Sequence, residues 1–260
     1  MMIHPTAIID PSAEIHESVE IGPFVVIGKN VKIGEGTKIE SSVRIHDNVE
    51  IGKNNFIDHS AAIGGMPQSV GFDPKLVSGV KIGDNNLIRE FVTIHRASKE
   101  NENTIIKNNA FLMENAHVAH DAIIGNYAII VHAVAIAGHV VVDDHAFISG
   151  LVAIHQFCRV GTFSMVAGCS KVVKDVPPYS TVDGNPASVI GLNPVGMKRK
   201  GIPLEIRNEI KEAYKLIYHS HLNTKQALQK IEEELNLNHP EIATIYKFFK
   251  ESERGVTDHR

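Results

Sequence analysis

The sequence predicts a mainly β protein, a parallel β-helix of hexapeptide repeats that is followed by a small α-helical domain. Three observations predict it. Aliphatic residues recur at every sixth position over most of the chain. Aromatic residues make up only 6% of the 260 residues and tryptophan is absent, which suits a core made of small, equal slots. After Pro194 the apolar spacing changes to that of helices.

The repeat places isoleucine at every sixth position from Ile3 to Ile63, then resumes at Ile82 after a slip of one residue and continues to Val172. In an α-helix six residues advance a side chain by about 600°, so these side chains would be scattered around the helix. Because six is even, a strand returns each of them to the same face. Three short strands joined by turns close a triangular coil of about 18 residues, and stacked coils pair their strands in parallel about 4.8 Å apart.

Two segments interrupt the repeat and are predicted to be loops that leave the coils. The first lies between Ile63 and Ile82, and the second, which is polar, lies between Ile94 and Ile106. Loops on a rigid scaffold often carry binding residues. We therefore expect part of the functional site on these two loops.

The end of the chain is predicted to be helical. Pro203 precedes apolar residues at helical spacing, Thr224 is the expected N-cap of a second helix, and Pro240 begins a third. The predicted domains are the β-helix over 1–193 and the helical domain over 194–260.

Composition excludes several classes of protein. A formal net charge of −4 argues against a protein that mainly coats nucleic acid. Cys158 and Cys169 are too few for a disulfide framework. The chain shows no secretory signal and no apolar run near the ~20 residues of a membrane span. We expect a cytoplasmic protein with no nucleic-acid partner and no stable membrane insertion.

Histidines gather in one strip of the predicted coils. Counting in coils of about 18 residues from Val118 brings five polar residues to neighbouring positions. They are His117, His120, His139, His155 and Gln156. Asp121 follows His120 directly and is placed to orient its imidazole, as in a general base that works near neutral pH. A zinc site is the competing interpretation, although no two histidines have the five-residue spacing of the β-helical carbonic anhydrases.

Several segments resemble one family of enzymes. They are MENAHVAHDAIIGN, AGHVVVDD, AIHQFCRVG, REFVTIHR and CSKVVKDVPPY. These segments are similar to the acyl-carrier-protein-dependent UDP-N-acetylglucosamine O-acyltransferases, which begin lipid A biosynthesis, and the resemblance extends to the C-terminal AYKLIY run. It implies a left-handed β-helix and a homotrimer with its sites between subunits. It also implies transfer of a (R)-3-hydroxyacyl chain from the phosphopantetheine thioester of acyl carrier protein to the 3-position of the UDP-amino-sugar, without a separate cofactor.

The resemblance also implies roles for single residues. His120 is expected to be the general base, Asp121 its partner, and Gly138 the residue whose backbone N–H faces the developing oxyanion. The implied substrate contacts are Asp73, Lys75, His95, His117, His139, His155, Gln156, Gly168, Asn193, Arg199 and Lys200. No metal ligand is expected.

The chain departs from the family pattern at a few positions. Val195 stands where an acidic residue is expected, Lys200 where an arginine is expected, and Lys171 where glycine is usual. We expect an acyl chain in the range of about C10 to C14, and either the 3-hydroxyl or the 3-amino sugar nucleotide as acceptor. The basic residues around Lys198 to Lys200, with Arg207 and Lys211, suit an acidic carrier protein.

Two other classes of protein remain open at this point. One is a β-helical acyltransferase that uses coenzyme A, which would lack the helical tail. The other is a β-helix without enzymatic activity that acts as a scaffold or binds a metal.

Overall fold

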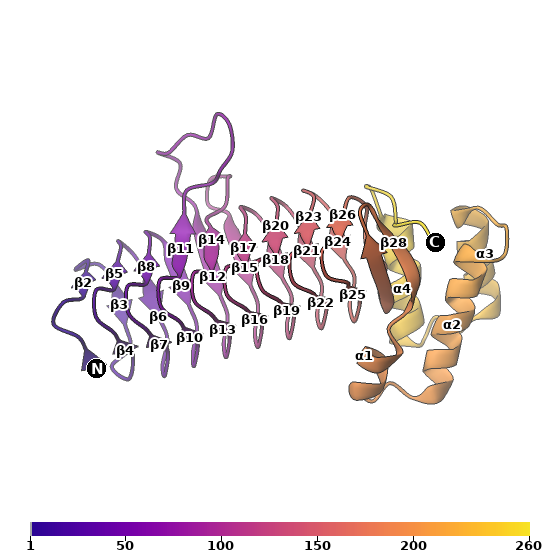
Figure 1. Cartoon of the computed structure of the whole chain (residues 1–260), viewed down its shortest axis with the longest axis horizontal. Helices are drawn as coiled ribbons and strands as arrows, with labels where there is room; N and C mark the ends of the chain where they lie inside the picture. The colour runs from indigo at the N-terminus through magenta and orange to yellow at the C-terminus, as the bar shows by residue number, and fades with distance from the viewer. Residues whose placement is uncertain (1) are drawn as a thin grey trace.

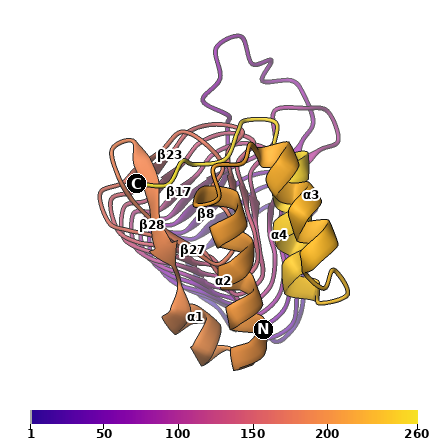
Figure 2. The same ribbon diagram turned by 90° about the vertical axis from the view of Figure 1, so that its right-hand side faces the viewer.

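Each hexapeptide folds as a short strand followed by a turn, and three of them complete one coil of a triangular prism. The computed structural model describes residues 2–260. The coils stack along one axis, and helices close the C-terminal end of the stack (Figure 1). Viewed along that axis, the strands overlie one another in three flat sides (Figure 2). We call these sides sheets A, B and C, in the order in which the chain visits them.

The three sheets are parallel except for the last strand of sheet A. Sheet A contains β1 (Met2–Ile3), β4 (Glu20–Ile21), β7 (Lys38–Ile39), β10 (Phe56–Ile57), β13 (Leu87–Ile88), β16 (Phe111–Leu112), β19 (Ile129–Ile130), β22 (Phe147–Ile148), β25 (Met165–Val166), β27 (Ser180–Gly184) and β28 (Ala187–Leu192). Sheet B contains β2 (Ile8–Ile9), β5 (Val26–Ile27), β8 (Arg44–Ile45), β11 (Ala62–Gly65), β14 (Thr93–His95), β17 (His117–Val118), β20 (Ala135–Ile136), β23 (Ala153–Ile154) and β26 (Lys171–Val172). Sheet C contains β3 (Glu14–Ile15), β6 (Lys32–Ile33), β9 (Val49–Ile51), β12 (Gly79–Ile82), β15 (Asn103–Ile106), β18 (Ile123–Ile124), β21 (Val141–Val142) and β24 (Arg159–Val160).

The repeating aliphatic residues fill the prism. The strand register pairs Ile130 with Ile148 and Val118 with Ile136, so each side chain stacks on its equivalent in the next coil. All four are completely buried. Because every coil offers the same slot, branched residues of one size pack throughout, and a large ring has no place in the interior.

The corners of the prism require unusual backbone angles. One residue in most turns has a φ near +60°, a region that asparagine and glycine tolerate better than other residues. Asn54, Asn85 and Asn109 occupy this position in three turns. Asp121 and His139 occupy it in two others, with φ of 60° and 61°. Two residues predicted to be functional therefore take the costlier conformation at their corners.

Two loops leave the prism at one corner, the edge where the chain passes from sheet B to sheet C. We call this edge the B–C corner, and name the C–A and A–B corners in the same way. Residues 66–78 connect β11 to β12, and residues 96–102 connect β14 to β15. The first loop projects far from the prism (Figures 1 and 2). The structure thus has loops at both predicted interruptions of the repeat.

The C-terminal helices are α1 (Pro194–Arg199), α2 (Leu204–Tyr218), α3 (Thr224–Glu234) and α4 (Pro240–Glu251). The apolar spacing of the sequence gives no signal for α1. The predicted cap of the next-but-one helix is wrong: Asn223, not Thr224, is the N-cap of α3, because its side chain accepts from the backbone of Gln226 while the Gln226 side chain accepts from the backbone of Asn223. Among residues 2–260 no helix is long and apolar enough to cross a membrane.

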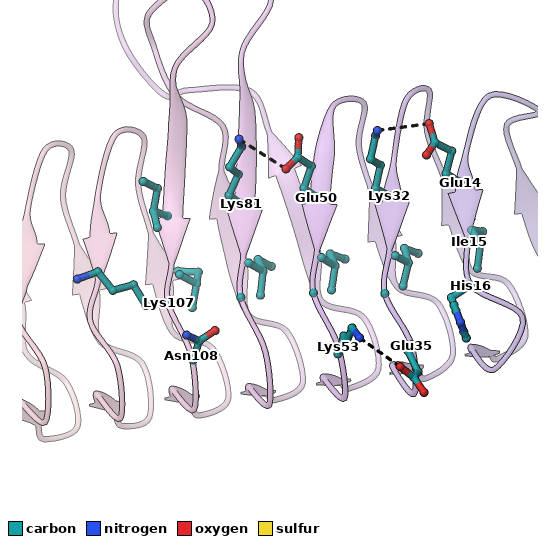
Figure 3. A pocket seen from close by; sticks show the side chains of 18 of the residues that line it. Glu14, Ile15, His16, Lys32, Glu35, Glu50, Lys53, Lys81, Lys107 and Asn108 are labelled. Carbon is teal, nitrogen blue, oxygen red and sulfur yellow. Dashed lines mark hydrogen bonds and ion pairs between the residues drawn. The ribbon is translucent and has the colours of Figure 1, made fainter.

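The outer face of sheet C carries alternating charges in its N-terminal coils. Lys32 lies 3.4 Å from Glu14, and Lys81 lies 3.5 Å from Glu50 (Figure 3). These pairs line a wide, shallow groove. Since all four side chains are more than half exposed, each pair contributes at most about 1 kcal/mol. The groove is therefore a row of solvated surface ion pairs and not a binding site.

Candidate active site

The predicted histidine strip lies at the B–C corner. β17 leads into His120 and Asp121, and β20 leads into Gly138 and His139. Because Val118 pairs with Ile136, the two turns lie directly one above the other. The rings of His120 and His139 meet edge to face with centroids 5.2 Å apart.

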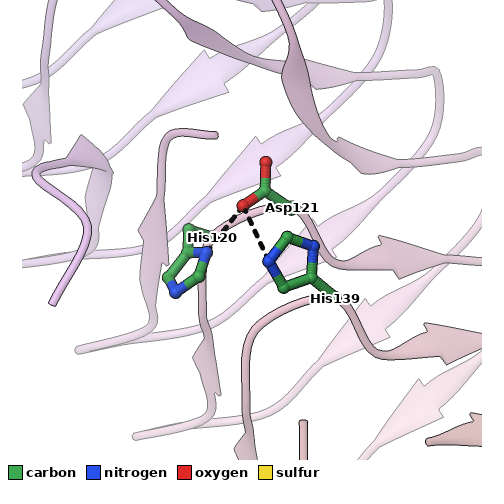
Figure 4. A group of neighbouring side chains, drawn as sticks. All are labelled: His120, Asp121 and His139. Carbon is green, nitrogen blue, oxygen red and sulfur yellow. Dashed lines mark hydrogen bonds and ion pairs between the residues drawn. The ribbon is translucent and has the colours of Figure 1, made fainter. Parts of the chain in front are cut away.

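A single carboxylate oxygen connects the two histidines. Oδ2 of Asp121 lies 2.6 Å from Nδ1 of His120 and 3.5 Å from Nε2 of His139 (Figure 4). The side chains of His120 and Asp121 are only 15% and 11% exposed. The second nitrogen of His120, Nε2, points away from Asp121 (Figure 4). An imidazole whose Nδ1–H is held by a carboxylate has Nε2 free to take a proton, which is the arrangement of a general base.

The charge of Asp121 depends on its hydrogen bonds. Burial raises the pKa of its carboxyl, but hydrogen bonds from Ser98 and His120 outweigh burial, so the pKa lies below its ordinary value. The backbone N–H of Ser98 donates to Oδ1 at 3.0 Å and to Oδ2 at 3.2 Å, and its Oγ donates to Oδ2 at 2.6 Å. Asp121 is therefore ionised at neutral pH and able to fix the orientation of His120.

Gly138 lies against the imidazole of His120. A Cβ atom added at Gly138 would lie 2.6 Å from Cε1 and 2.8 Å from Nε2 of His120. Only glycine fits there without moving the ring. The backbone N–H of Gly138 donates no hydrogen bond to any group in residues 2–260, which leaves it free to donate to a ligand. The structure thus brings together His120, Asp121, Gly138 and His139 as the sequence predicted.

His139 is fixed from the other side by an aromatic ring. Its imidazole stacks on Phe157 with centroids 4.6 Å apart and planes 4° from parallel. Its backbone N–H donates to the carbonyl of His120 at 3.1 Å. Burial lowers the pKa of His139, and the nearby carboxylate of Asp121 offsets only part of this effect.

A second pair of predicted residues lies nearby: His95 ends β14 in the preceding coil, and His117 begins β17 in the same coil as His120. Their rings meet edge to face with centroids 4.7 Å apart, and Nδ1 of His117 lies 2.7 Å from Oγ1 of Thr93. His95 is 9% exposed, and its Nδ1 has no hydrogen-bond partner within residues 2–260. Burial, followed by the positive charges of His117, His120 and His46, lowers the pKa of His95 to about 4.

We expect His95 to make the protein less stable in mild acid. The unfolded chain binds a proton at His95 below about pH 6.5, whereas the folded chain, with its pKa of about 4, does not. This residue should therefore leave the free energy of unfolding unchanged above about pH 6.5. As the pH drops toward 4, it should lower that free energy by about 2 kcal/mol. Urea unfolding at pH 7 and at pH 4.5 measures this difference. His95→Gln should reduce it by about that amount, and an unchanged difference would contradict the assignment.

His155 and Gln156 lie at the same corner one coil further along and are exposed. Nδ1 of His155 lies 2.9 Å from the guanidinium of Arg254, which belongs to the segment after α4. That segment returns to the last coils, where Arg254 also donates to the carbonyl of Val173. The C-terminal tail therefore borders the end of the histidine strip.

Three side chains at this corner also have the arrangement of a metal site. One donor atom from each of His120, Asp121 and His139 lies within 4.8 Å of the other two, and no other such group occurs in residues 2–260. Two imidazoles and a carboxylate are ordinary ligands of zinc. The same residues thus support both the general-base and the metal-binding interpretations.

Comparison with known proteins decides the family. Residues 175–257 match the family described as UDP N-acetylglucosamine O-acyltransferase, domain 2, residues 103–138 match the bacterial transferase hexapeptide, and residues 3–98 match the GMPPB C-terminal domain. An acyl-[acyl-carrier-protein]–UDP-N-acetylglucosamine O-acyltransferase of Gloeothece citriformis is 46% identical over 70% of this chain and 65% of its own, so the match spans slightly less than two thirds of that relative. The solved UDP-N-acetylglucosamine acyltransferase of Bacteroides fragilis is 46% identical with a TM-score of 0.94, over 98% of this chain and 99% of its own. The chain belongs to this family.

A second solved acyltransferase of the family, from Francisella novicida, is 41% identical with a TM-score of 0.96, over 99% of this chain and 94% of its own. The fold predicted from the sequence, a left-handed parallel β-helix with a small C-terminal helical domain, is confirmed by these likenesses. So is the assignment to the family of acyltransferases.

Other residues that the family resemblance singles out lie away from the B–C corner. Gly168 is exposed at the A–B corner, after β25. Asn193, Arg199 and Lys200 lie at the two ends of α1. They border a groove of about 620 Å³ on the outer face of sheet A. Within one chain, these residues therefore do not lie in the His120 strip.

Asn193 and Lys200 have structural contacts of their own. Asn193 is the N-cap of α1, accepts from the N–H of Gly196 at 2.9 Å, and donates from Nδ2 to the carbonyl of Phe163. The ammonium of Lys200 lies 5.0 Å from the centre of the Tyr127 ring. These contacts hold α1 against the C–A corner.

Asp73 and Lys75 lie on the projecting loop 66–78. A carboxylate oxygen of Asp73 accepts from the backbone N–H of Lys75 at 2.9 Å, and both side chains are exposed. The loop leaves the prism at the same corner as His120, two strands earlier in the stack of sheet B, from β11 to β17. The predicted substrate residues of the loop and the histidine strip thus lie along one edge.

Sequence reasoning missed two features. Ser98, which holds Asp121, lies in the loop 96–102 where the period of six is broken, so counting gives no signal for it. A ladder of stacked rings follows the C–A corner, from Tyr127 through His145 and Phe163 to Tyr179. The first three are 18 residues apart, and this spacing is a signal that would have found them.

Proposed function

We propose that this acyltransferase moves a (R)-3-hydroxyacyl chain from acyl carrier protein to the 3-position of UDP-N-acetylglucosamine, or of its 3-amino analogue, in the first step of lipid A biosynthesis. The observation that carries the proposal is the imidazole of His120, which Asp121 holds on one nitrogen and which lies against Gly138, a residue whose backbone N–H donates to no group in residues 2–260. The names of the relatives supply the substrates.

The geometry supports a two-stage acyl transfer. Nε2 of His120 takes the proton of the acceptor group, whose oxygen or nitrogen forms a bond to the thioester carbonyl carbon. The resulting oxyanion accepts a hydrogen bond from the N–H of Gly138. When the carbonyl re-forms, the carbon–sulfur bond breaks, and the phosphopantetheine thiolate leaves with the proton that the imidazole carried. Asp121 stabilises the charged imidazolium between the two stages. The acyl carrier protein that supplies the acyl chain is the only carrier molecule that the reaction needs.

The site is proposed to form between subunits of a homotrimer. On the C-terminal coils the outer face of sheet A presents Phe111, Ile129, Phe147 and Met165, and that of sheet C presents Ile105, Ile123 and Val141. A ring of identical prisms joins two different faces at each interface. Packing sheet C of one subunit on sheet A of the next buries these apolar side chains. Because the B–C corner is an edge of sheet C, the same packing sets His120 beside its neighbour's groove.

Mixed trimers test the shared site. His120→Ala and the double variant Arg199→Ala with Lys200→Ala should each be nearly inactive alone. In trimers reassembled from an equal mixture, about a quarter of the interfaces combine an intact His120 with an intact Arg199 and Lys200, so about a quarter of the activity should return. Activity that stays at the level of the single variants would place all these residues in one subunit's site.

Carrier-protein docking is proposed on the helical end. Arg207 and Lys211 of α2 line a second groove of about 600 Å³ between α1, α2 and β28. Basic side chains of this kind steer an acidic partner to a surface.

The C-terminal helical domain also argues against the coenzyme A-dependent alternative, for which the helical tail has no use.

The direct test is the identity of the product. The protein is supplied with both acceptor sugar nucleotides and a ladder of acyl carrier protein thioesters from C10 to C14, and the products are identified by mass. A 3-acylated sugar nucleotide supports the proposal, and the absence of any would overturn it. Repeating the assay after chelation separates the metal-binding alternative, since activity lost on chelation and restored by zinc would favour a metal at His120, Asp121 and His139.

A further inference from the structure

The short loop 96–102 contacts both parts of the proposed site. Arg96 and Ser98 lie only two residues apart, but this stretch is irregular and their side chains contact different parts of the protein. Ser98 reaches Asp121, and Arg96 reaches the projecting loop 66–78. The loop is itself fixed to the prism, because the N–H groups of Arg96 and Ala97 donate to the carbonyls of Gly65 and Gly79.

Ser98 determines which of two histidines the carboxylate of Asp121 binds. Oδ2 of Asp121 is within reach of both His120 and His139, at 2.6 Å and 3.5 Å. The carboxylate rotates about one bond, and this rotation changes both distances. The hydroxyl of Ser98 donates to Oδ2, and its backbone N–H is shared between Oδ1 at 3.0 Å and Oδ2 at 3.2 Å. Together they fix that rotation with Oδ2 on the His120 side. Without the hydroxyl of Ser98, Oδ2 loses its shortest hydrogen bond from this loop, and only the backbone N–H of Ser98 still holds the carboxylate from that side, so the carboxylate is less firmly held against turning toward His139.

Arg96 holds the loop that carries Asp73 and Lys75. Its guanidinium donates to the carbonyls of Pro74 and Leu76 at 3.1 and 2.5 Å, and to Oγ of Ser78 at 3.1 Å. It also lies 5.0 Å from the centre of the Phe72 ring. A planar guanidinium with several fixed acceptors is well suited to hold a projecting loop in one conformation.

We propose that the loop 96–102 positions the two halves of the site separately: Ser98 aligns Asp121 on the general base His120, and Arg96 presents the loop 66–78 to the sugar nucleotide. Both are positioning residues that act through other groups. The inference rests on the proposed function, since it needs His120 as the base. It assigns effects on kcat to Ser98 and effects on KM to Arg96.

The test of Ser98 compares Ser98→Ala with Ser98→Thr. Loss of a hydrogen bond to a charged group should lower kcat by about 10- to 100-fold, and KM for the sugar nucleotide should change by less than about twofold. Threonine keeps the hydroxyl and should restore kcat to within about threefold. In an Asp121→Asn background, Ser98→Ala should add little, because residues that act as a unit are not additive. An unchanged kcat in Ser98→Ala, or an effect that persists in Asp121→Asn, would overturn the assignment.

The test of Arg96 uses Arg96→Ala. With the loop released, KM for the sugar nucleotide should rise about tenfold while kcat changes by less than about twofold. The matched control is Arg89→Ala, which removes an arginine bound to Asp58 and Glu90 at 3.0 Å, away from the loop. It should change neither constant. A fall in kcat without a change in KM would contradict the role given to Arg96.

These outcomes separate the inference from the function on which it rests. If His120→Ala is active, the proposed general base fails whatever Ser98 does. If His120→Ala is inactive while Ser98→Ala and Arg96→Ala behave like the unaltered protein, only the positioning role fails. Thermal unfolding of each variant identifies any loss that comes from misfolding.

Discussion

Replacing His120 by alanine should lower kcat by about 10³-fold or more and leave the fold intact. Oδ2 of Asp121 lies 2.6 Å from Nδ1 of His120 but 3.5 Å from Nε2 of the neighbouring imidazole, His139, so the variant loses the base that the carboxylate holds. The β-helix does not depend on this ring, since the core residues of that coil, Val118 and Ala122, are on the inside of the prism. Steady-state kinetics with the acyl carrier protein thioester measure the loss, and thermal unfolding checks the fold.

The matched control is His16→Ala. His16 lies in an N-terminal coil, and its Nδ1 bonds only to the hydroxyl and N–H of Ser18. The His16→Ala variant should be fully active. The activity of Asp121→Asn should lie between those of His120→Ala and His16→Ala, because the amide keeps the shape of the carboxylate but not its charge. Activity of His120→Ala within about tenfold of the control would remove the general base from the mechanism.

The fixed period explains why so much of the site could be predicted from the sequence. In a coil of constant length, the position along the chain gives both the corner and the height of a residue. Counting from Val118 therefore places Gly138 over His120 and His139 beside it, and the structure has them there. The same count sets Gly168 at a different corner, and the structure has it there, after β25.

The rest depends on contacts that no period describes. Ser98 reaches Asp121 because the loop 96–102 folds back onto the corner, and its path is determined by hydrogen bonds to Gly65 and Gly79. The short helix α1 depends on Asn193, whose side chain caps it while also bonding to Phe163. The groove beside sheet A and the His120 strip belong to separate corners of one chain. Their meeting in one site belongs to the proposed trimer, and packing between subunits follows no period in the sequence.

Gly138→Ala is the second change for which we expect a large effect, about a 10²-fold fall in kcat. An added Cβ would lie 2.6 Å from Cε1 of His120, closer than carbon atoms approach, so the imidazole must move. Moving the ring breaks its bond to Asp121 and shifts Nε2 away from the acceptor. The φ of Gly138 is not in the left-handed region, so alanine fits the backbone itself. Steady-state kinetics measure the loss, and Gly138→Val, with a larger side chain, should show a greater one.

Gly150→Ala is the matched control, because it adds the same methyl group at another corner. The nearest atom to a Cβ at Gly150 is the carbonyl oxygen of His132 at 3.4 Å, an ordinary contact. This variant should retain kcat, and both variants should unfold within a few degrees of the unaltered protein. If Gly138→Ala retained kcat to within about twofold, the imidazole would have room to work in another position. The close contact between Gly138 and His120 would then be a feature of packing and not of catalysis.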